Sequence, residues 1–234
     1  MTYVTSDLHG YRFDEFVKLL KRAGFGPGDE LYVIGDVIDR NTDGGIALLQ
    51  WMLSSSKTVH LLRGNHEDML LKCERVFMEA DTVFMSGDVL SLLTDFMNWQ
   101  YNGAECTIAS LRGLYEYDRE EFDRIMEYIK AAPIYRELTV NGRKFLLVHG
   151  GLNGFEKGKQ LSEYPVHDLL WSRPAPEDEY FDDVLTIIGH TPTQYYDDKE
   201  GRAYKTRTWI DIDTGAGSGG SPMLLRLEDM AEFY

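Results

Sequence analysis

The chain has 234 residues, 43% of them hydrophobic, a length and composition that suit one globular domain rather than two. Asp and Glu outnumber Lys and Arg by 39 to 24, and the formal net charge of −15 disfavours binding to nucleic acid or to an anionic membrane. Cys73 and Cys106 belong to no Cys-x-x-Cys pair, and the first residues lack the basic and apolar regions of a signal peptide, so we expect a cytoplasmic protein.

Strands and helices alternate through the first third of the chain. Short apolar runs predict strands at 2–6, 31–35 and 59–62. The spacing of apolar residues predicts helices beginning at Phe13 and covering 44–53 and 67–80. This alternation is typical of a mostly parallel sheet covered by helices.

The second half of the chain is richer in strands. Residues 86–132 predict a mainly helical insertion, with helical periodicity over 87–97 and 118–130. Asn141 and Gly142 form the strongest short signal for a hairpin. They would join strands at 134–140 and 143–150, and further strands are expected at 183–190, 202–206, 208–213 and 223–228. We therefore expect two sheets packed face to face, with helices outside.

Polar side chains follow five of these expected strands, at the point where each strand ends. They are Asp7 and His9 after the first strand, Asp36, Asp39 and Arg40 after the second, Asn65 and His66 after the third, and His149 and His190 after two strands of the second half. In open α/β sheets, ligands bind beyond the carboxyl ends of the strands. Since four of the six histidines occupy these positions, beside carboxylates, we expect one shared metal site.

The types of these side chains indicate which metals they would bind. Carboxylate, imidazole and amide groups suit borderline divalent ions such as Mn, Fe or Zn, and without a thiolate a structural zinc site is not expected. Asp7 and His9 are two residues apart, so in an extended segment they point to the same side and can bind one ion. Asp36 is free to bridge two ions, and a pair about 3.5–4 Å apart forms a clamp for in-line displacement at phosphorus.

The same segments, taken in order, resemble a known family. Between residues 5 and 220 the chain contains "DLHG", "GDVIDRN", "GNHE", "VHGG" and "GHTP", together with "WSRP" and "DTGAGSGG". This pattern resembles the calcineurin-like metallophosphoesterases, and within them the phosphoprotein phosphatases, among which the bacterial and bacteriophage Ser/Thr protein phosphatases look most similar. The resemblance implies the α/β class and a four-layer α/β/β/α sandwich of two mixed sheets flanked by helices. Residues 1–234 would form a single domain of this kind, with the helical insertion at 86–132.

The resemblance also implies a dinuclear metal site. Its ligands would be Asp7, His9 and Asp36 for the first ion, and Asp36, Asn65, His149 and His190 for the second. Two divalent ions are expected, with Mn2+ as the first choice and Fe or Zn as alternatives. A hydroxide that bridges the ions would attack phosphorus directly, because metal binding can lower the pKa of a bound water to about 7.

Other residues are expected to act on the substrate. Because neighbouring side chains in an extended segment diverge, His66 cannot easily share the ion of Asn65, and it is expected to protonate the leaving group. Asp39 would orient and charge the His66 imidazole. Arg40 and Arg173 are expected to bind phosphate oxygens, and Asn65 to contact the substrate as well as the metal.

These expectations lead to a first function and to alternatives. The resemblance implies a hydrolase, a metal-dependent phosphomonoesterase and first of all a protein Ser/Thr phosphatase, whose substrate is a phosphoprotein or a small phosphate ester, with no nucleic-acid or membrane partner. The alternative is a symmetrical hydrolase of dinucleoside polyphosphates such as diadenosine tetraphosphate. "GDVIDR" favours the first activity, since the dinucleotide hydrolases usually lack the second Asp of this motif. A catalytically silent binding module is disfavoured because all six ligands are present, and a nuclease is disfavoured by the net charge.

Two details depart from familiar patterns. Asn41 stands where most of the resembled family has Gly after the Arg, which would alter the shape of the phosphate pocket. Gly215, Gly217 and Gly220 spell a dinucleotide-binding fingerprint. A strand-like segment rather than a helix follows these glycines, so we do not expect that kind of nucleotide site there.

Overall fold

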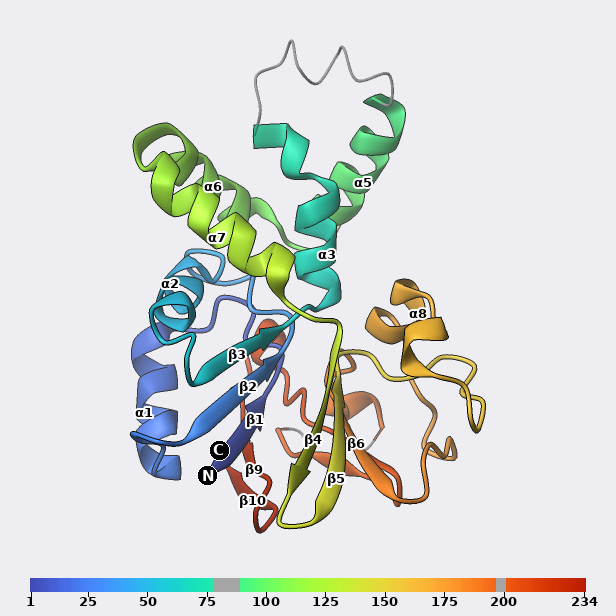
Figure 1. Cartoon of the computed structure of the whole chain (residues 1–234). Coiled ribbons are helices and arrows are strands. Elements are labelled where there is room, and N and C mark those ends of the chain that lie inside the picture. The colour runs from blue at the N-terminus through green and yellow to red at the C-terminus, as the bar shows by residue number, and fades with distance from the viewer. Residues whose placement is uncertain (78–88, 197–200) are drawn as a thin grey trace.

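Two five-stranded sheets pack face to face in the computed structural model, which describes residues 1–77, 89–196 and 201–234 (Figure 1). The first sheet contains β1 (Thr2–Thr5), β2 (Glu30–Ile34), β3 (Val59–Leu62), β9 (Leu224–Arg226) and β10 (Ala231–Phe233), in the spatial order β10-β9-β1-β2-β3. β1, β2 and β3 run parallel to one another, as predicted. β9 runs antiparallel to both of its neighbours, so the first sheet is mixed.

The second sheet is built from the later strands of the chain. It contains β4 (Tyr135–Val140), β5 (Arg143–Val148), β6 (Val184–Ile188), β7 (Tyr204–Lys205) and β8 (Trp209–Asp211), in the spatial order β4-β5-β6-β8-β7. β4 and β5 form the hairpin predicted at Asn141 and Gly142. β5, β6 and β8 are parallel and the two edge strands are antiparallel, so this sheet is mixed too. The expected α/β sandwich of two mixed sheets is confirmed.

The last strands of the chain join the first sheet and not the second. β9 pairs with β1, so that Tyr3 lies opposite Arg226 and Val4 opposite Leu225. β10 is not predicted from the sequence, because its three residues are too few to show a period of two. The pairing of β9 with β1 also brings the loop 213–222 back to the end of β1, where it becomes part of the functional site.

The helices lie outside the sheets. They are α1 (Phe13–Ala23), α2 (Ile46–Ser54), α3 (Asn65–Lys72), α5 (Val89–Tyr101), α6 (Glu105–Tyr117), α7 (Arg119–Ala131) and α8 (Val166–Leu170), with the short 3₁₀ turns η1 (Glu74–Phe77), η2 (Leu161–Glu163), η3 (Thr193–Tyr195) and η4 (Ala216–Ser218). α1 and α2 cover the outer face of the first sheet, and α8 lies beside the second (Figure 1). Among the described residues, none of these helices has both the length and the apolar character that crossing a bilayer requires.

Two predicted helices differ in extent from those observed. The helix expected over 67–80 ends at Lys72 and is followed by η1, while residues 78–80 lie outside the described part of the chain. The periodic segment 87–97 falls within α5, apart from its first two residues, which are also outside the description. Both segments therefore form helix where the structure describes them, except for the turn after Lys72.

The segment 118–130, predicted to be helical, corresponds to α7. The Asp118 side chain accepts a hydrogen bond from the N–H of Glu121 at 3.2 Å, which caps the start of this helix. α6 was not predicted from periodicity. Its buried residues are Thr107 and Leu111, too few to make a clear apolar stripe.

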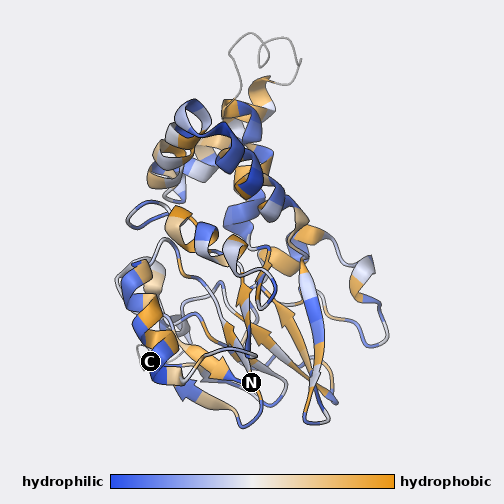
Figure 2. Cartoon of the chain, turned by 60° about the vertical axis from the view of Figure 1, so that its left-hand side comes forward, coloured by the Kyte–Doolittle hydropathy of each residue, from blue (hydrophilic) through white to orange (hydrophobic). Residues whose placement is uncertain are grey.

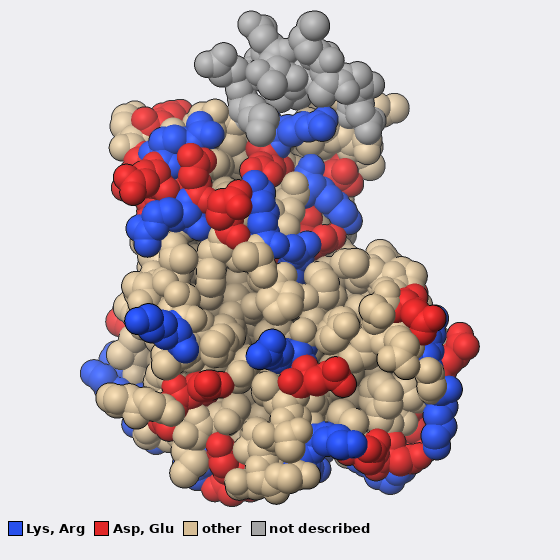
Figure 3. Space-filling model, viewed as in Figure 1, with Lys and Arg blue, Asp and Glu red and all other residues tan. Residues whose placement is uncertain are grey.

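Helices α5, α6 and α7 stand beyond the carboxyl ends of β1, β2 and β3 (Figure 1). Positive and negative side chains are interleaved on the face of this helical region that Figure 3 shows. Ion pairs join Arg119 to Asp123, Arg124 to Glu121 and Lys130 to Glu74. Exposed pairs of this kind contribute about 0–1 kcal/mol each, so they describe a solvated surface rather than a source of stability.

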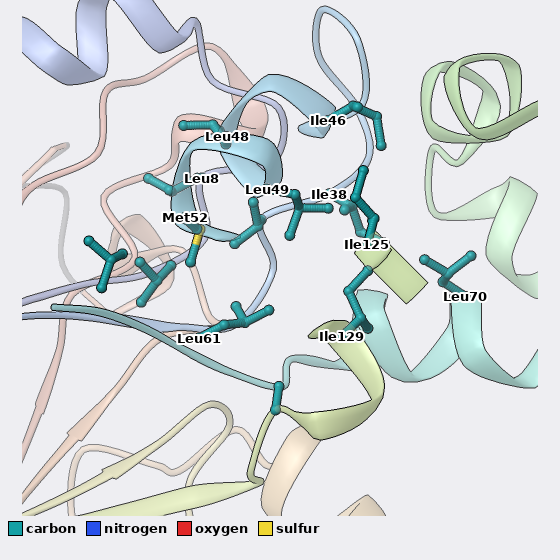
Figure 4. Close-up of a cluster of buried hydrophobic side chains, with 14 of the residues drawn as sticks. Leu8, Ile38, Ile46, Leu48, Leu49, Met52, Leu61, Leu70, Ile125 and Ile129 are labelled. Atoms are coloured by element: carbon teal, nitrogen blue, oxygen red, sulfur yellow. The ribbon is translucent and has the colours of Figure 1, made fainter. Parts of the chain in front are cut away.

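Alternation along the strands divides the apolar residues between the two faces of each sheet. In β2, Leu31 and Val33 face the covering helices, whereas Tyr32 and Ile34 face the second sheet. In Figure 2 the strands are mostly coloured as hydrophobic, whereas hydrophobic and hydrophilic residues alternate along the helices. The core under the helices is drawn in Figure 4, where side chains from α2, α3 and α7 meet those of the first sheet.

We propose that the described chain folds as a single domain, because α7 contributes to the same core as the sheet. Ile125 and Ile129 of α7 are fully buried and lie in one cluster with Leu49 of α2 and Leu61 of β3 (Figure 4).

Ile129→Ala should therefore destabilise the whole protein. We expect the free energy of unfolding in urea to fall by about 2–5 kcal/mol, because a fully buried Ile leaves a cavity in the shared core. Tyr117→Ala, at a residue that is 87% exposed, is the matched control and should change the free energy by less than about 0.5 kcal/mol. Two separate unfolding transitions, with only one of them shifted by Ile129→Ala, would contradict the single domain.

Candidate metal centre

The polar residues predicted at five strand ends lie together in the structure. β1, β2 and β3 deliver one set and β5 and β6 the other, and the two sheets face each other with these ends side by side. The six expected metal ligands are Asp7, His9, Asp36, Asn65, His149 and His190, and each is at most 6% exposed. Burying polar groups without partners costs free energy. A buried cluster of six such side chains therefore indicates a binding site whose ligand compensates that cost.

Asp36 lies at the centre of the cluster. Its Oδ2 is 3.5 Å from His9 Nε2, and its Oδ1 is 3.3 Å from His149 Nε2. Asp7 Oδ1 lies 3.9 Å from His9 Nε2, on the first of these two sides. One carboxylate oxygen thus faces each histidine group, which is the arrangement required of a ligand shared by two ions.

The second group of ligand atoms is equally close. Asn65 Oδ1 lies 2.8 Å from His149 Nε2. Single ligand atoms of Asp36, His149 and His190 all lie within 4.8 Å of one another, as do those of His9, Asp36 and His66. Two neighbouring positions therefore exist at which several oxygen and nitrogen atoms converge.

Backbone contacts fix which nitrogen of two histidines can bind a metal. His9 Nδ1 lies 3.0 Å from the carbonyl oxygen of Ile38, and His149 Nδ1 lies 2.7 Å from that of Ile34. A carbonyl can only accept, so Nδ1 donates in both residues, and Nε2 is the nitrogen that would bind a metal once it carries no proton. Backbone support of this kind is usual for metal-binding histidines.

Unsatisfied buried atoms supply the test of whether a metal fits. Asp7 Oδ1 and His190 Nε2 are buried and have no hydrogen-bond partner among the described residues. Leaving such an atom unpaired costs about 1–3 kcal/mol, and two divalent cations would satisfy one atom each. The donor set of carboxylate, imidazole and amide oxygen suits borderline divalent metals and does not choose among Mn, Fe and Zn.

The charges of the cluster also favour a bound cation. Burial raises the pKa of Asp7 to about 6. Burial alone would lower the pKa of His149, but the negative charge of Asp36 outweighs it and raises that pKa to about 10. A proton on His149 would balance the negative charge of Asp36, and a metal ion bound at the same nitrogen would release that proton.

His66 lies close enough to join the first group of ligands, but its contacts favour another role. Its Nδ1 is 2.6 Å from Asp39 Oδ2, and Arg40 Nη2 is 3.3 Å from its Nε2. A metal ion bound at Nε2 would therefore lie next to a guanidinium group, and the two positive charges would repel. We accordingly propose, as expected from the sequence, that His66 acts on the substrate and is not a ligand.

Asp39 is held by two residues of the helical insertion that were not predicted as functional. Trp99 of α5 donates from Nε1 to Asp39 Oδ2 at 2.8 Å, and Thr107 of α6 donates from Oγ1 to Asp39 Oδ1 at 2.5 Å. All three side chains are fully buried. In the sequence, a Trp and a Thr on amphipathic helices look like ordinary core residues, so no signal could have identified them.

Glu67 shapes the backbone around the bridging carboxylate. It lies in the first turn of α3, as expected, and its carboxylate accepts hydrogen bonds from the N–H groups of Asp36 at 2.9 Å, Val37 at 2.8 Å and Gly64 at 2.8 Å. The side chain ties the end of β2 to the end of β3. These contacts give Glu67 a structural role.

The backbone is strained where the site residues lie. Nine residues other than glycine have positive φ in the described part of the chain. Six of them are predicted site residues: Asp7, His9, Asp36, Asp39, Arg40 and His190. Each such conformation costs of order 1–3 kcal/mol, and clusters of them are typical of active sites. Close approach adds to the constraint, since a Cβ at Gly189 would lie 2.1 Å from Asp7 Oδ2.

The two predicted phosphate-binding arginines line one pocket of about 660 Å³ beside the cluster. Arg173 Nη1 donates to the carbonyl oxygen of His190 and to Thr191 Oγ1, both at 3.1 Å, so its guanidinium is anchored next to a predicted metal ligand. Arg40 reaches the same pocket from the opposite sheet. The structure thus brings Arg40 and Arg173 together, as a clamp on phosphate would require.

The departure at Asn41 has a structural explanation. Its Nδ2 donates to the carbonyl oxygens of His9 at 2.9 Å and Ala216 at 3.2 Å, and so joins the end of β1 to the glycine-rich loop. Within that loop, a Cβ at Gly217 would lie 2.4 Å from His9 Cδ2 and 2.7 Å from Arg40 Nη1. The loop contains only the short turn η4 and no longer helix, so Gly217 serves close packing on the site and the glycines do not form a dinucleotide fingerprint.

Asp36→Asn tests the shared ligand. We expect this variant to bind divalent ions at least about 100-fold more weakly and to lose most of the metal that the wild-type protein retains after dialysis, as measured by mass spectrometry. A chelator should lower the melting temperature of the wild type and leave that of Asp36→Asn almost unchanged, since bound metal stabilises the folded state.

Asp68→Asn is the control, because Asp68 lies on the same helix as Asn65 but pairs with Lys72 at 2.9 Å on the surface. Wild-type metal content in Asp36→Asn would exclude this carboxylate as the shared ligand.

Comparison with known proteins identifies the family. The family model described as Calcineurin-like phosphoesterase matches residues 2–212. The chain is 34% identical over 215 residues to the symmetrical bis(5'-nucleosyl)-tetraphosphatase of Glaesserella parasuis serovar 5 (strain SH0165), with 86% of this chain and 61% of that protein covered. The chain thus spans about three fifths of the length of this relative.

Solved structures share the fold. A candidate diadenosine tetraphosphatase superposes with a TM-score of 0.64 at 13% identity, over 99% of this chain and 90% of that one. A Ser/Thr phosphatase from Saccharomyces cerevisiae, similar to human phosphatase PP5, gives a TM-score of 0.54 at 14% identity, over 96% and 72%. These identities support a common fold alone. The match over residues 2–212 shows that the chain belongs to the calcineurin-like metallophosphoesterases, which are hydrolases of phosphate esters.

Proposed function

We propose that the protein hydrolyses dinucleoside polyphosphates of the symmetrical tetraphosphate type at a dinuclear metal centre. The observation that carries this proposal is the 34% identity, over 86% of the chain, to a symmetrical bis(5'-nucleosyl)-tetraphosphatase. The size of the pocket beside the cluster supports it, since about 660 Å³ exceeds what one phosphate group fills. The motif "GDVIDR" favours a protein Ser/Thr phosphatase over a dinucleotide hydrolase. The identity to the tetraphosphatase reverses that ranking of the two activities.

The proposed chemistry follows from the residues in the cluster. Two divalent ions, with Mn2+ as the first candidate for both, would be held by the six side chains of the cluster. These are Asp7, His9, Asp36, Asn65, His149 and His190. Such ions supply an acidified water and polarise the phosphate. Arg40 and Arg173 would bind phosphate oxygens that are not bound to metal and would orient the phosphorus for in-line attack.

His66 would deliver a proton to the leaving oxygen. Burial alone would lower the pKa of His66, but the charge of Asp36 and the hydrogen bond with Asp39 raise it above its usual value. The present contact between Arg40 and His66 Nε2 requires that nitrogen to accept. When a phosphate group takes the Arg40 hydrogen bonds, Nε2 can carry the proton instead.

A second candidate function is hydrolysis of phosphoserine or phosphothreonine. The 2.6 Å contact between His66 and Asp39 favours it, because an alkoxide leaves poorly unless it is protonated. A nucleoside diphosphate leaves from an anhydride far more easily and depends less on an acid. The two candidates therefore share the metal centre and differ in how much they need this pair.

Direct competition of substrates tests the proposal. With Mn2+ present, we expect kcat/KM for diadenosine tetraphosphate to exceed that for a phosphoserine peptide by at least about tenfold. Symmetrical cleavage should give ADP as the only nucleotide product, measured by ion-exchange chromatography. A peptide that is hydrolysed faster than the tetraphosphate would replace the first candidate with the second.

His66→Asn tests the proton donor. The variant should retain its metal and lose about 10²–10⁴-fold in kcat on alkyl phosphates, whose leaving groups need a proton. Aryl phosphates with good leaving groups, such as p-nitrophenyl phosphate, should lose much less. Equal losses on both kinds of ester would rule out the acid role.

A further inference from the structure

The lining of the pocket beside the metal cluster is chemically mixed. Arg40 and Arg173 supply positive charge, and His190 belongs to both the pocket and the cluster. Apolar surface comes from Pro174, Pro176, Pro192, Tyr195 and Tyr196. A ligand that fills such a pocket carries both an anionic and an apolar group.

Tyr195 is an exposed aromatic residue in the lining of this pocket. It ends the turn η3, where its N–H donates to the carbonyl oxygen of Pro192 at 2.9 Å, and the N–H of Thr193 donates to the carbonyl oxygen of Asp213 at 2.9 Å. The backbone of Tyr195 is therefore fixed, yet the residue is 75% exposed. A fixed, exposed aromatic ring beside a pocket offers a flat apolar surface that a planar ligand can cover.

The neighbouring tyrosine behaves differently and provides a comparison. The Tyr196 ring stacks on Tyr204, with centroids 4.7 Å apart and planes at 25°, and it also packs on Trp209. Within the described part of the chain, no aromatic ring packs on Tyr195 in this way. Both tyrosines line the pocket, but the core of the second sheet holds the ring of Tyr196, whereas Tyr195 is largely exposed.

We propose that Tyr195, with the proline wall, forms a subsite for the base of a nucleotide whose phosphate is bound between Arg40 and Arg173. This inference rests on the proposed function and adds the residue that recognises the organic part of the substrate. Stacking on a tyrosine suits any planar base, so the subsite selects nucleotides over bare phosphate chains without choosing one base. Proline and tyrosine lose little conformational entropy on binding, which makes the wall suitable for a flat ring.

Binding of analogues that cannot be hydrolysed tests the subsite apart from turnover. The probes are α,β-methylene-ADP and methylenediphosphonate, which share the phosphonate chain and differ in the nucleoside. For the metal-loaded wild type, calorimetry should give at least about tenfold tighter binding of the nucleotide probe, because of stacking. The same preference is expected in Tyr195→Phe, which keeps the ring, and it should fall to within about twofold in Tyr195→Ala.

Tyr101→Ala is the matched control, since Tyr101 is 91% exposed at the end of α5 and does not line the pocket. It should bind both probes as the wild type does. The same preference in Tyr195→Ala and the wild type, or no preference in the wild type, would overturn the subsite. So would equal loss of both probes in Tyr195→Ala, because that would mean a general disturbance of the site.

Kinetics then separate the two proposals. Tyr195→Ala should raise KM for diadenosine tetraphosphate by about tenfold with little change in kcat, because stacking acts equally on bound substrate and transition state. If the wild type does not hydrolyse this substrate but the probes show the Tyr195 dependence, the proposed function fails and the subsite stands. If turnover occurs and the probes show no dependence, the subsite fails and the function stands.

Discussion

The carboxylate of Asp36 lies between two groups of histidines, with one oxygen 3.5 Å from His9 and the other 3.3 Å from His149. The other features of the site depend on this position, because Asp36 joins strand ends from the first and the second half of the chain. A buried carboxylate with several neighbouring imidazoles and a second buried acid, Asp7, is costly without compensating cations. The cluster is therefore an arrangement for binding divalent metal, as the family of the chain would lead one to expect.

The surrounding fold holds this arrangement against strain. Positive φ values at Asp7 and Asp36 are maintained by parallel strands on one side and by the hydrogen bonds of Glu67 on the other. The helical insertion contributes in a different way, since Trp99 and Thr107 orient Asp39 and through it His66. Stability and function are thus linked, because the helices that complete the core also align a proposed catalytic pair.

Much of the fold and of the candidate site could be predicted, because the relevant sequence patterns lie within short segments of the chain. A strand followed at once by Asp36 or by Asn65 carries its side chain to the end of the sheet whatever the rest of the chain does. Contacts between distant segments could not be predicted. Nothing near Trp99 or Thr107 in the sequence indicates that they meet Asp39, and nothing near β9 and β10 indicates that these strands join the first sheet. The pocket at Tyr195 depends on such distant contacts too.

The substrate would be chosen in part by residues that the local sequence patterns do not identify. The metal ligands are common to enzymes of many specificities in this fold, so they leave the substrate open. The pocket between Arg40, Arg173 and Tyr195 lies outside the cluster and is formed by loops, where specificity usually resides. The proposed selectivity therefore depends on loop residues beside the cluster, while Arg40, Arg173 and His190 belong to both the pocket and the proposed chemistry.

Anomalous diffraction from crystals grown with Mn2+ can show whether two metal ions share Asp36. We expect two anomalous peaks on either side of the Asp36 carboxylate, one in contact with His9 and the other with His149 and His190. A single peak, or two peaks of which only one contacts Asp36, would exclude Asp36 as a ligand shared by two ions.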